Sequence, residues 1–181
     1  PLYFYREPSA PDLELTEQDV PLDAVRDARI FWVSATGLSK EPSRSAHRAA
    51  LDARGRKEHT IIDLDYRAAF WPDEAAAHEA VSAVLPGTTV AIGNREECRI
   101  AVGQTEPERA ADALLEAGVE LAIVKQGPLG TLAKTRDERI EMPEMAPDTH
   151  EEGASVRNTL KATAITRPGR EAAAEKKAEA A

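Results

Sequence analysis

The sequence contains a single cysteine, Cys98, and no apolar run near the roughly 18 residues that a membrane span requires. One cysteine excludes an internal disulfide and fits a reducing compartment. Basic residues are also in deficit, since 23 Lys and Arg against 32 Asp and Glu give a net charge of −9. This negative field disfavours binding to nucleic acid and to anionic membrane surfaces. We therefore expect a cytoplasmic protein with neither of these partners.

Several familiar site motifs are missing as well. The histidines lack the spacing of metal ligands, and no second cysteine supports them. The sequence has no Walker-type glycine loop and no Ser-His-Asp arrangement. These absences argue against a zinc site, a P-loop and a serine hydrolase. The histidines concerned are His47, His59, His78 and His150.

What the sequence does contain is an alternation of strand-like and helix-like segments. Hydrophobic residues make up 42% of the 181, enough for a packed core. Apolar runs predict strands at 29–34, 59–65, 88–93 and 120–125, and helical periods predict helices at 43–57, 73–85, 95–102 and 106–117. A final hairpin is predicted at 131–134 and 139–142. This alternation indicates an α/β layered fold with a mostly parallel sheet, flanked by helices that cover both of its faces.

The two ends of the chain differ from this pattern. The sequence begins with Pro1 and passes at once into a strand-like segment at 2–5, and a domain seldom begins inside a strand. From about residue 145 the chain becomes acidic and rich in helix breakers, and 171–181 consists of Ala, Glu and Lys. We expect a partial domain at 1–143, incomplete at both ends, followed by a poorly packed tail at 144–181.

Polar residues follow two of the predicted strands, at the end where parallel sheets bind their ligands. Asp63 and Asp65 end the second predicted strand, and Arg67 follows it. The guanidinium of Arg67 is a candidate to bind a carboxylate or a phosphate through two parallel hydrogen bonds, or else it pairs with a neighbouring aspartate. Asn94 and Glu97 follow the third strand. They are suited to order a metal-bound water near phosphates, or else they form an ordinary helix cap.

Two further segments are candidate parts of a site. Gly127 and Gly130, just past the fourth strand, would let backbone amides approach an anion or a nucleotide, but a tight hairpin turn needs the same spacing. Tyr5 and Arg6 lie in the extended first segment and form either a polar lid strand or a solvated edge. Cys98 falls within a predicted helix, where we expect it to be buried as a small apolar residue.

Five strings occur along the chain in a fixed order, and each is weak by itself. They are residues 3–10 (Tyr-Phe-Tyr-Arg-Glu-Pro-Ser-Ala), 36–44 (Thr-Gly-Leu-Ser-Lys-Glu-Pro-Ser-Arg), 63–67 (Asp-Leu-Asp-Tyr-Arg) with Phe70 and Trp71, 93–97 (Gly-Asn-Arg-Glu-Glu) and 124–127 (Val-Lys-Gln-Gly). Together they resemble the PfkB, or ribokinase-like, carbohydrate kinases over about residues 1–143. The resemblance is strongest to the branch that phosphorylates a deoxygluconate-type sugar acid in myo-inositol catabolism.

The resemblance implies ATP-dependent phosphorylation of a sugar hydroxyl, with Mg²⁺ on the phosphates. By motif position, Asn94 and Glu97 correspond to the family's Asn-x-x-Glu pair, which organises Mg²⁺ and the phosphates, and Glu97 would be the residue at the metal. Gly127 and Gly130 would line the nucleotide side.

On the substrate side, the resemblance implies that Arg67, together with Tyr5 and Arg6, faces the sugar acid. An arginine suits such a substrate, because a guanidinium binds a carboxylate through two parallel hydrogen bonds.

The chain departs from the family where the catalytic base is expected. The family's Gly-Ala-Gly-Asp string, which binds the anion and accepts the hydroxyl proton, should occur near residue 150. The nearest string is Gly-Ala-Ser-Val at 153–156, so Val156 stands in the place of the base. We therefore identify no catalytic residue and predict that this chain has no kinase activity of its own.

The alternative hypothesis is a non-catalytic relative that binds nucleotide or sugar acid weakly, or that serves as an interaction module. The family's first strands have no counterpart ahead of Pro1 in this sequence. Their absence would leave a sheet edge unpaired and apolar faces uncovered, which favours association. We expect a tendency to form homodimers and marginal solubility as a monomer.

Overall fold

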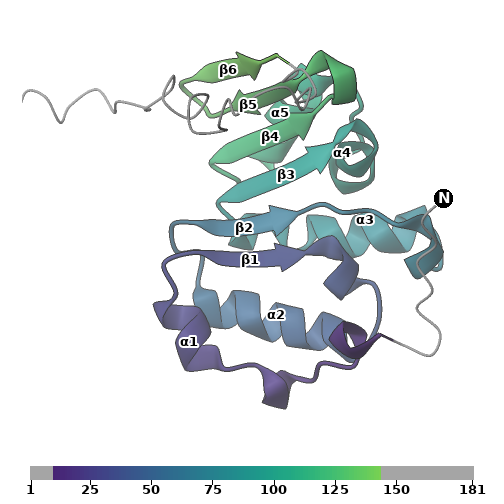
Figure 1. Ribbon diagram of the computed structural model, residues 1–181, viewed down its shortest axis with the longest axis vertical. Coiled ribbons are helices and arrows are strands. Elements are labelled where there is room, and N and C mark those ends of the chain that lie inside the picture. The colour runs from purple at the N-terminus through teal and green to yellow at the C-terminus, as the bar shows by residue number, and fades with distance from the viewer. Residues whose placement is uncertain (1–9, 144–181) are drawn as a thin grey trace, which may run out of the picture. The chain divides into compact units, whose positions relative to one another are not determined.

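The computed structural model describes residues 10–143 (Figure 1). The strand expected at 2–5, with Tyr5 and Arg6, and the tail at 144–181, with Val156, lie outside the described residues. No helix among the described residues is both long enough and apolar enough to cross a membrane.

The α-helices are α1 (Leu22–Asp27), α2 (Ser43–Arg54), α3 (Glu74–Ser82), α4 (Arg95–Val102) and α5 (Pro107–Glu116). The strands are β1 (Phe31–Ser34), β2 (Thr60–Asp63), β3 (Val90–Asn94), β4 (Leu121–Lys125), β5 (Thr131–Lys134) and β6 (Arg139–Met142). The 3-10 helices are η1 (Pro11–Leu13), η2 (Glu17–Asp19), η3 (Ala35–Leu38), η4 (Ala68–Phe70), η5 (Leu85–Gly87) and η6 (Gly127–Leu129).

The helices begin and end at residues whose chemistry favours those positions. Asn94 caps α4, since its side-chain oxygen accepts two backbone N–H groups of the first turn. Glu106 caps α5 in the same way, ahead of Pro107 at the first helical position. Gly103 and Gly55 end α4 and α2 with φ values of +73° and +65°, the left-handed conformation that favours glycine. Local sequence therefore sets these boundaries.

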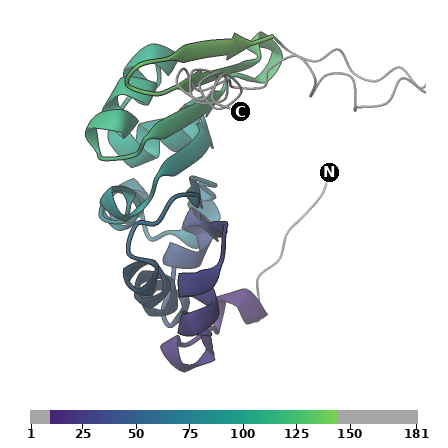
Figure 2. The same cartoon turned by 90° about the vertical axis from the view of Figure 1, so that its left-hand side faces the viewer.

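The six strands form one sheet in the order in which they occur along the chain (Figure 1). Strands β1–β4 are parallel, and β5 and β6 continue the sheet antiparallel. The helices α3 and α5 lie behind the strands in Figure 1. In Figure 2, the helices in the upper half of the picture form a second layer beside the strands. The expected α/β fold with a mostly parallel sheet is thus confirmed.

The core lies between the sheet and these helices. Ile62 of β2, Ala91 of β3 and Val124 of β4 are buried completely on the helix-facing side of the sheet. Leu114 of α5 and Cys98 of α4 pack in the same cluster and are equally buried. The expected burial of Cys98 is therefore confirmed.

The expectation that helices would cover both faces of the sheet is wrong for residues 10–143. A row of side chains on the other face, defined here as the open face, is only partly buried, and Trp32 is 54% exposed. The strand order explains this result. Crossovers between parallel strands are almost always right-handed, so strands in sequential order carry their connecting helices on one face. Covering the second face needs a reversal of the strand order, and none occurs from β1 to β4. The open-face row consists of the register neighbours Trp32, Ile61, Val90 and Leu121.

Candidate functional site

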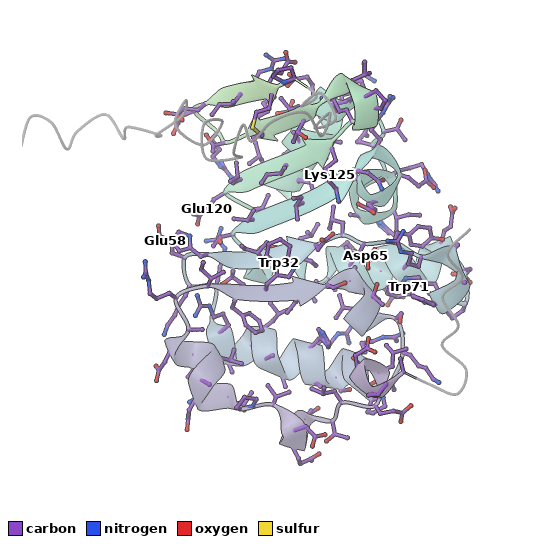
Figure 3. The ribbon with its side chains drawn as sticks, viewed as in Figure 1. Trp32, Glu58, Asp65, Trp71, Glu120 and Lys125 are labelled. Carbon is purple, nitrogen blue, oxygen red and sulfur yellow. The ribbon has the colours of Figure 1, made fainter. Side chains whose placement is uncertain are left out.

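The last residues of the four parallel strands are all polar: Ser34 on β1, Asp63 on β2, Asn94 on β3 and Lys125 on β4. Because the strands are parallel, these residues meet at one edge of the sheet, which we call the carboxyl edge. The register pairs Ser34 with Asp63 and Asn94 with Lys125. Figure 3 shows Lys125 and Asp65 at this edge, the one to which the arrows of β1–β4 point. The carboxyl edge is the candidate site.

Asn94 and Glu97 form a reciprocal cap at the start of α4. The Asn94 side-chain oxygen accepts the N–H groups of Glu96 and Glu97, each at 2.9 Å, and Glu97 Oε2 accepts the N–H of Asn94 at 2.6 Å. The helix-cap alternative is thus realised. The same cap holds the Glu97 carboxylate at the carboxyl edge. The structural and the ligand-binding interpretations of this pair are therefore compatible.

Glu97 is a buried carboxylate, and its side chain is only 6% exposed. Its partner in charge is Lys125, whose Nζ lies 3.6 Å from Glu97 Oε2. Both charges influence the pKa of the adjacent Cys98 thiol. Burial first, and then the Glu97 carboxylate, raise the pKa of Cys98 to about 12, while the Lys125 ammonium partly lowers it. A thiol with this pKa stays protonated at neutral pH, so Cys98 acts as a small apolar core residue.

Gly93 allows α4 to begin close to the sheet. A Cβ at this position would lie 2.8 Å from Leu64 Cδ1 and 3.2 Å from Glu97 Cβ. These distances are shorter than the optimal separation of about 3.5–4.0 Å between carbon atoms. A larger residue would therefore press against Leu64 and against the Cβ of Glu97, so Gly93 allows Glu97 to lie this close to the sheet.

Asp65, rather than Arg67, is the centre of the second polar group. Thr36 Oγ1 of η3 donates to Asp65 Oδ2 at 2.7 Å, and Ser34 Oγ approaches the same oxygen at 3.5 Å. Arg67 pairs with Asp65 through an Nη2–Oδ1 distance of 3.0 Å, and its side chain is exposed. The Arg–Asp pair, one of the two alternatives for this segment, is therefore present. A role of Arg67 toward a substrate stays a prediction.

Gly127 and Gly130 bracket η6 in the turn that joins β4 to β5, with φ values of +59° and +87°. The N–H of Gln126 donates to the carbonyl of Gly130 at 2.8 Å, and the N–H of Gly130 donates to the carbonyl of Gly127 at 2.9 Å. The hairpin-turn alternative is thus realised. A Cβ on Gly127 would meet no atom within 4 Å, so the space beside this residue is open to a ligand.

Trp71 lies just after η4, at the same end of the sheet (Figure 3), and is 7% exposed. Its Nε1 is the only buried side-chain nitrogen or oxygen in residues 10–143 without a hydrogen-bond partner. An unpaired buried N–H costs about 1–3 kcal/mol. The large apolar area of the indole offsets this cost, because Trp71 packs in the main core cluster.

The described part of the chain offers a metal one anchored carboxylate rather than a complete ligand set. Within residues 10–143, no group of three or more His, Cys, Asp or Glu side chains is placed to hold a metal ion. Mg²⁺ that accompanies a nucleotide does not need such a group, because it is bound through one or two carboxylates, several waters and the phosphates. The buried, capped carboxylate of Glu97 fits this requirement.

Two contacts of the carboxyl edge were not predicted from the sequence: Thr36 with Asp65, and Lys125 with Glu97. Each joins groups that follow different strands, so their proximity depends on strand order and register. One positional signal was available for Lys125. It ends an apolar run as the last residue of its strand, as Asn94 does on the neighbouring strand.

Solved structures of other proteins share this fold. A PfkB protein from Polaromonas sp. JS666 matches with a TM-score of 0.71 and 20% identity, over 81% of this chain and 50% of its own. Aminoimidazole riboside kinase from Salmonella enterica matches with a TM-score of 0.63 and 20% identity, over 78% of this chain and 47% of its own. The fold is therefore that of the ribokinase-like kinases, as the resemblance implied.

Sequence similarity then identifies the family. The family described as pfkB family carbohydrate kinase matches residues 2–150, and the chain belongs to this family. Fructokinase-2 from Oryza sativa subsp. japonica is 33% identical over 150 residues, which cover 81% of this chain and 44% of the relative. A 5-dehydro-2-deoxygluconokinase from Clostridium tetani is 32% identical over 144 residues, which cover 75% of this chain and 42% of the relative.

The chain thus spans less than half the length of these two relatives. Its identities to the two kinds of kinase, 33% and 32%, are nearly equal. The similarity therefore establishes membership in a carbohydrate kinase family, but it does not distinguish between the sugars of the two kinds of kinase.

Proposed function

We propose that this chain forms the nucleotide side of an ATP-dependent carbohydrate kinase site whose substrate is a sugar acid. The observation that carries the proposal is Glu97, a buried carboxylate anchored by the cap of α4 at the edge where parallel sheets bind ligands. Membership in the family supplies the reaction class. Relatives named 5-dehydro-2-deoxygluconokinase support a sugar acid of that type. A cytoplasmic place in myo-inositol catabolism is part of the proposal and rests on the resemblance of the sequence motifs alone.

On the nucleotide side, we assign Asn94 and Glu97 to Mg²⁺ and the phosphates, and the turn from Gly127 to Gly130 to the nucleotide. Mg²⁺ supplies charge neutralisation on the transferred phosphoryl group. The contribution of this chain is to hold the Glu97 carboxylate through the N–H of Asn94 and to leave open space at Gly127.

On the substrate side, we assign Arg67 to the carboxylate of the sugar acid. Its guanidinium is exposed and already binds one carboxylate, that of Asp65. A substrate carboxylate offers the same geometry and can replace Asp65 as the partner. Tyr5 and Arg6 are assigned to the same substrate from their place in the family motif.

We further propose that the chain by itself binds nucleotide without turning it over. Its 181 residues contain no Gly-Ala-Gly-Asp string, and Val156, at the corresponding place, cannot accept the proton that the sugar hydroxyl must lose. Loss of a general base alone lowers a rate by about 10²–10⁴-fold. We expect an ADP-release assay with 5-dehydro-2-deoxygluconate to show no turnover above background. Sustained ADP release by the purified chain would contradict this part of the proposal.

Replacing Glu97 with glutamine is expected to weaken binding of Mg-ATP by about 10–100-fold, the usual effect of removing a group that orients a bound metal. Glu96→Gln is the matched control. Glu96 is the preceding residue of the same helix, but it is exposed and pairs with Arg99. Isothermal titration calorimetry of the purified chain measures both affinities.

Two results would contradict the assignment of the nucleotide side. The first is a wild-type chain that does not bind Mg-ATP at all. The second is an equal loss of affinity in the Glu97 and Glu96 variants, because a general change of surface charge would then explain it.

We also propose that the open face supports self-association, and that the chain forms homodimers through it. Trp32 and the neighbouring Ile30 are large, exposed apolar residues at the edge strand β1. No charged residue lies in 30–34, whereas soluble proteins commonly protect edge strands with charge. A lysine at position 32 would make association costly by placing a charge within an apolar contact.

Trp32→Lys is therefore expected to shift the chain from dimer to monomer, as measured by size-exclusion chromatography with light scattering. Leu15→Lys is the control, since Leu15 is an exposed apolar residue outside the sheet. A wild-type chain that is monomeric at high concentration, or a Leu15 variant that dissociates equally, would argue against the open face as the interface.

A further inference from the structure

A cavity of about 380 Å³ lies between α2 and the end of α3, two helices labelled in Figure 1. Pockets that bind small molecules begin at about 300 Å³. Because α2 leads into β2, and α3 leads through η5 into β3, the cavity lies toward the ends at which these strands begin. The carboxyl edge is at their opposite ends, so the cavity is separate from the site proposed for the nucleotide.

The floor of the cavity is apolar, and its α3 side consists of small residues. Leu51 and Val84 line it and belong to the main core cluster, at 6% and 8% exposure. Ala83 and Gly87 complete the lining on the α3 side, and a Cβ on Gly87 would meet nothing within 4 Å. Side chains this small leave the space between the two helices unfilled, which explains the cavity.

The α2 side of the cavity carries two opposite charges, Arg48 and Asp52, and both residues are exposed. Residues four apart are neighbours on a helix surface, but a basic residue that precedes the acidic one is the less favourable order for an ion pair. Neither side chain has a hydrogen bond or an ion pair with any other of residues 10–143. Both charges are therefore available to a ligand.

Asp52 is also unfavourably placed for its own helix. It lies in the last turn of α2, which ends at Arg54. The carboxyl end of a helix carries partial negative charge, so a carboxylate there is unfavourable and a cation is favoured. A bound ammonium group would offset this cost. Arg48, one turn earlier, offers the planar set of N–H donors that suits a carboxylate.

A cavity of about 340 Å³ between α3 and α4 shows the contrast. Its arginine, Arg99, donates to both Glu74 and Glu96 at distances of 2.6–3.0 Å. Its histidine, His78, has Nδ1 2.8 Å from the carbonyl oxygen of Ile100. These charged and polar side chains already have partners within the protein. Of these two cavities, the one between α2 and α3 thus has unpaired charges beside an apolar floor.

We propose that the cavity between α2 and α3 binds a free α-amino acid with an apolar side chain. The Arg48 guanidinium donates to its carboxylate, and the Asp52 carboxylate accepts from its ammonium group. Its side chain lies against Leu51 and Val84. A small zwitterion with an apolar side chain matches all three features of the cavity at once. The proposal is independent of the proposed function, because the two sites share no residue.

The test is an NMR titration of the isotope-labelled chain with L-leucine, followed at the backbone amides of Ala83 and Gly87. Two analogues of leucine each lack one charge: isocaproate has no ammonium group, and isoamylamine has no carboxylate. L-Leucine is expected to bind saturably and about tenfold or more tightly than either analogue, the effect of one hydrogen bond to a charged group.

Two variants assign the charges to their partners. Arg48→Met should remove the preference for L-leucine over isoamylamine, because the ligand carboxylate then has no partner. Asp52→Ala should remove the preference for L-leucine over isocaproate, because the ammonium group then has none. Arg109→Met is the matched control and should keep both preferences, since Arg109 is an exposed arginine of α5 outside the cavity.

A third variant tests the cavity itself. Ala83→Leu places a larger side chain in the lining and should abolish saturable binding of L-leucine, while thermal unfolding confirms that the variant is folded. Three results would overturn the proposal: a wild-type chain that shows no saturable shift with L-leucine, an analogue that binds as tightly as L-leucine, or unchanged binding in the folded Ala83 variant.

Discussion

Replacing Arg54 with alanine is expected to lower the free energy of unfolding by about 3 kcal/mol or more, because several buried acceptors would lose their donor at once. Arg54 ends α2 and is 2% exposed. Its Nε donates to Thr60 Oγ1 at 3.1 Å, and its Nη atoms donate to the carbonyl oxygens of Val25 at 3.2 Å and Glu58 at 2.9 Å, and also to that of Ala28.

These carbonyl groups explain why a positive charge is tolerated in the interior. The last carbonyls of a helix have no partner within it, and Val25 belongs to the last turn of α1. Arg54 therefore serves as a side-chain cap for α1 and ties it to the start of β2. A short side chain cannot reach these oxygens.

Arg48→Ala is the matched control, since Arg48 lies on the same helix and is exposed. Its expected effect is within about 0.5 kcal/mol. Urea unfolding followed by circular dichroism measures both variants. Similar midpoints for the two variants would show that the Arg54 hydrogen bonds contribute little.

The second large effect is expected at Gly37, where alanine should destabilise the fold by about 1–3 kcal/mol through overpacking. A Cβ on Gly37 would lie 2.1 Å from His47 Nε2 and 2.3 Å from His47 Cε1. The imidazole cannot simply move away, because its Nδ1 lies 2.8 Å from the carbonyl oxygen of Ser43. Gly37 is buried in η3, directly after β1, so the strain falls beside Thr36 and the carboxyl edge.

A double-mutant cycle isolates this clash. Gly37→Ala combined with His47→Ala should be more stable than the sum of the two single effects predicts, with a coupling of about 1 kcal/mol or more. Gly87→Ala is the control, since a Cβ at Gly87 would meet nothing within 4 Å. Additive effects of the Gly37 and His47 changes in urea unfolding would refute the predicted contact.

Local signals predicted the elements of the fold well. The helix at 95–102 and the hairpin strands at 131–134 and 139–142 have the bounds expected from the sequence, because Asn94, Gly103 and the turn residues act within a few positions. The coverage of the sheet was predicted wrongly. Periodicity reports that strands are apolar, but the face on which helices lie follows from strand order, which is not a local property.

The same distinction applies to the candidate site. Asn94 and Glu97 lie three residues apart, so their reciprocal cap was accessible to sequence reasoning. The pairing of Thr36 with Asp65 joins groups that follow different strands, and so it depends on the register of β1 and β2. For Arg67 and the Gly127–Gly130 turn, the structure shows the local alternative, an ion pair and a hairpin turn, and their role toward a ligand stays a prediction.

The one-sided placement of the helices also gives the protein two separate fluorescent reporters. The sequence contains two tryptophans. Trp32 stands on the open face at 54% exposure, and Trp71 is enclosed in the core at 7% exposure. Acrylamide should quench Trp32 strongly and Trp71 weakly, and single Trp→Phe variants would assign each emission. Anything that covers the open face would then shift the emission of Trp32 to the blue, while a large change in the emission of Trp71 would report unfolding of the core.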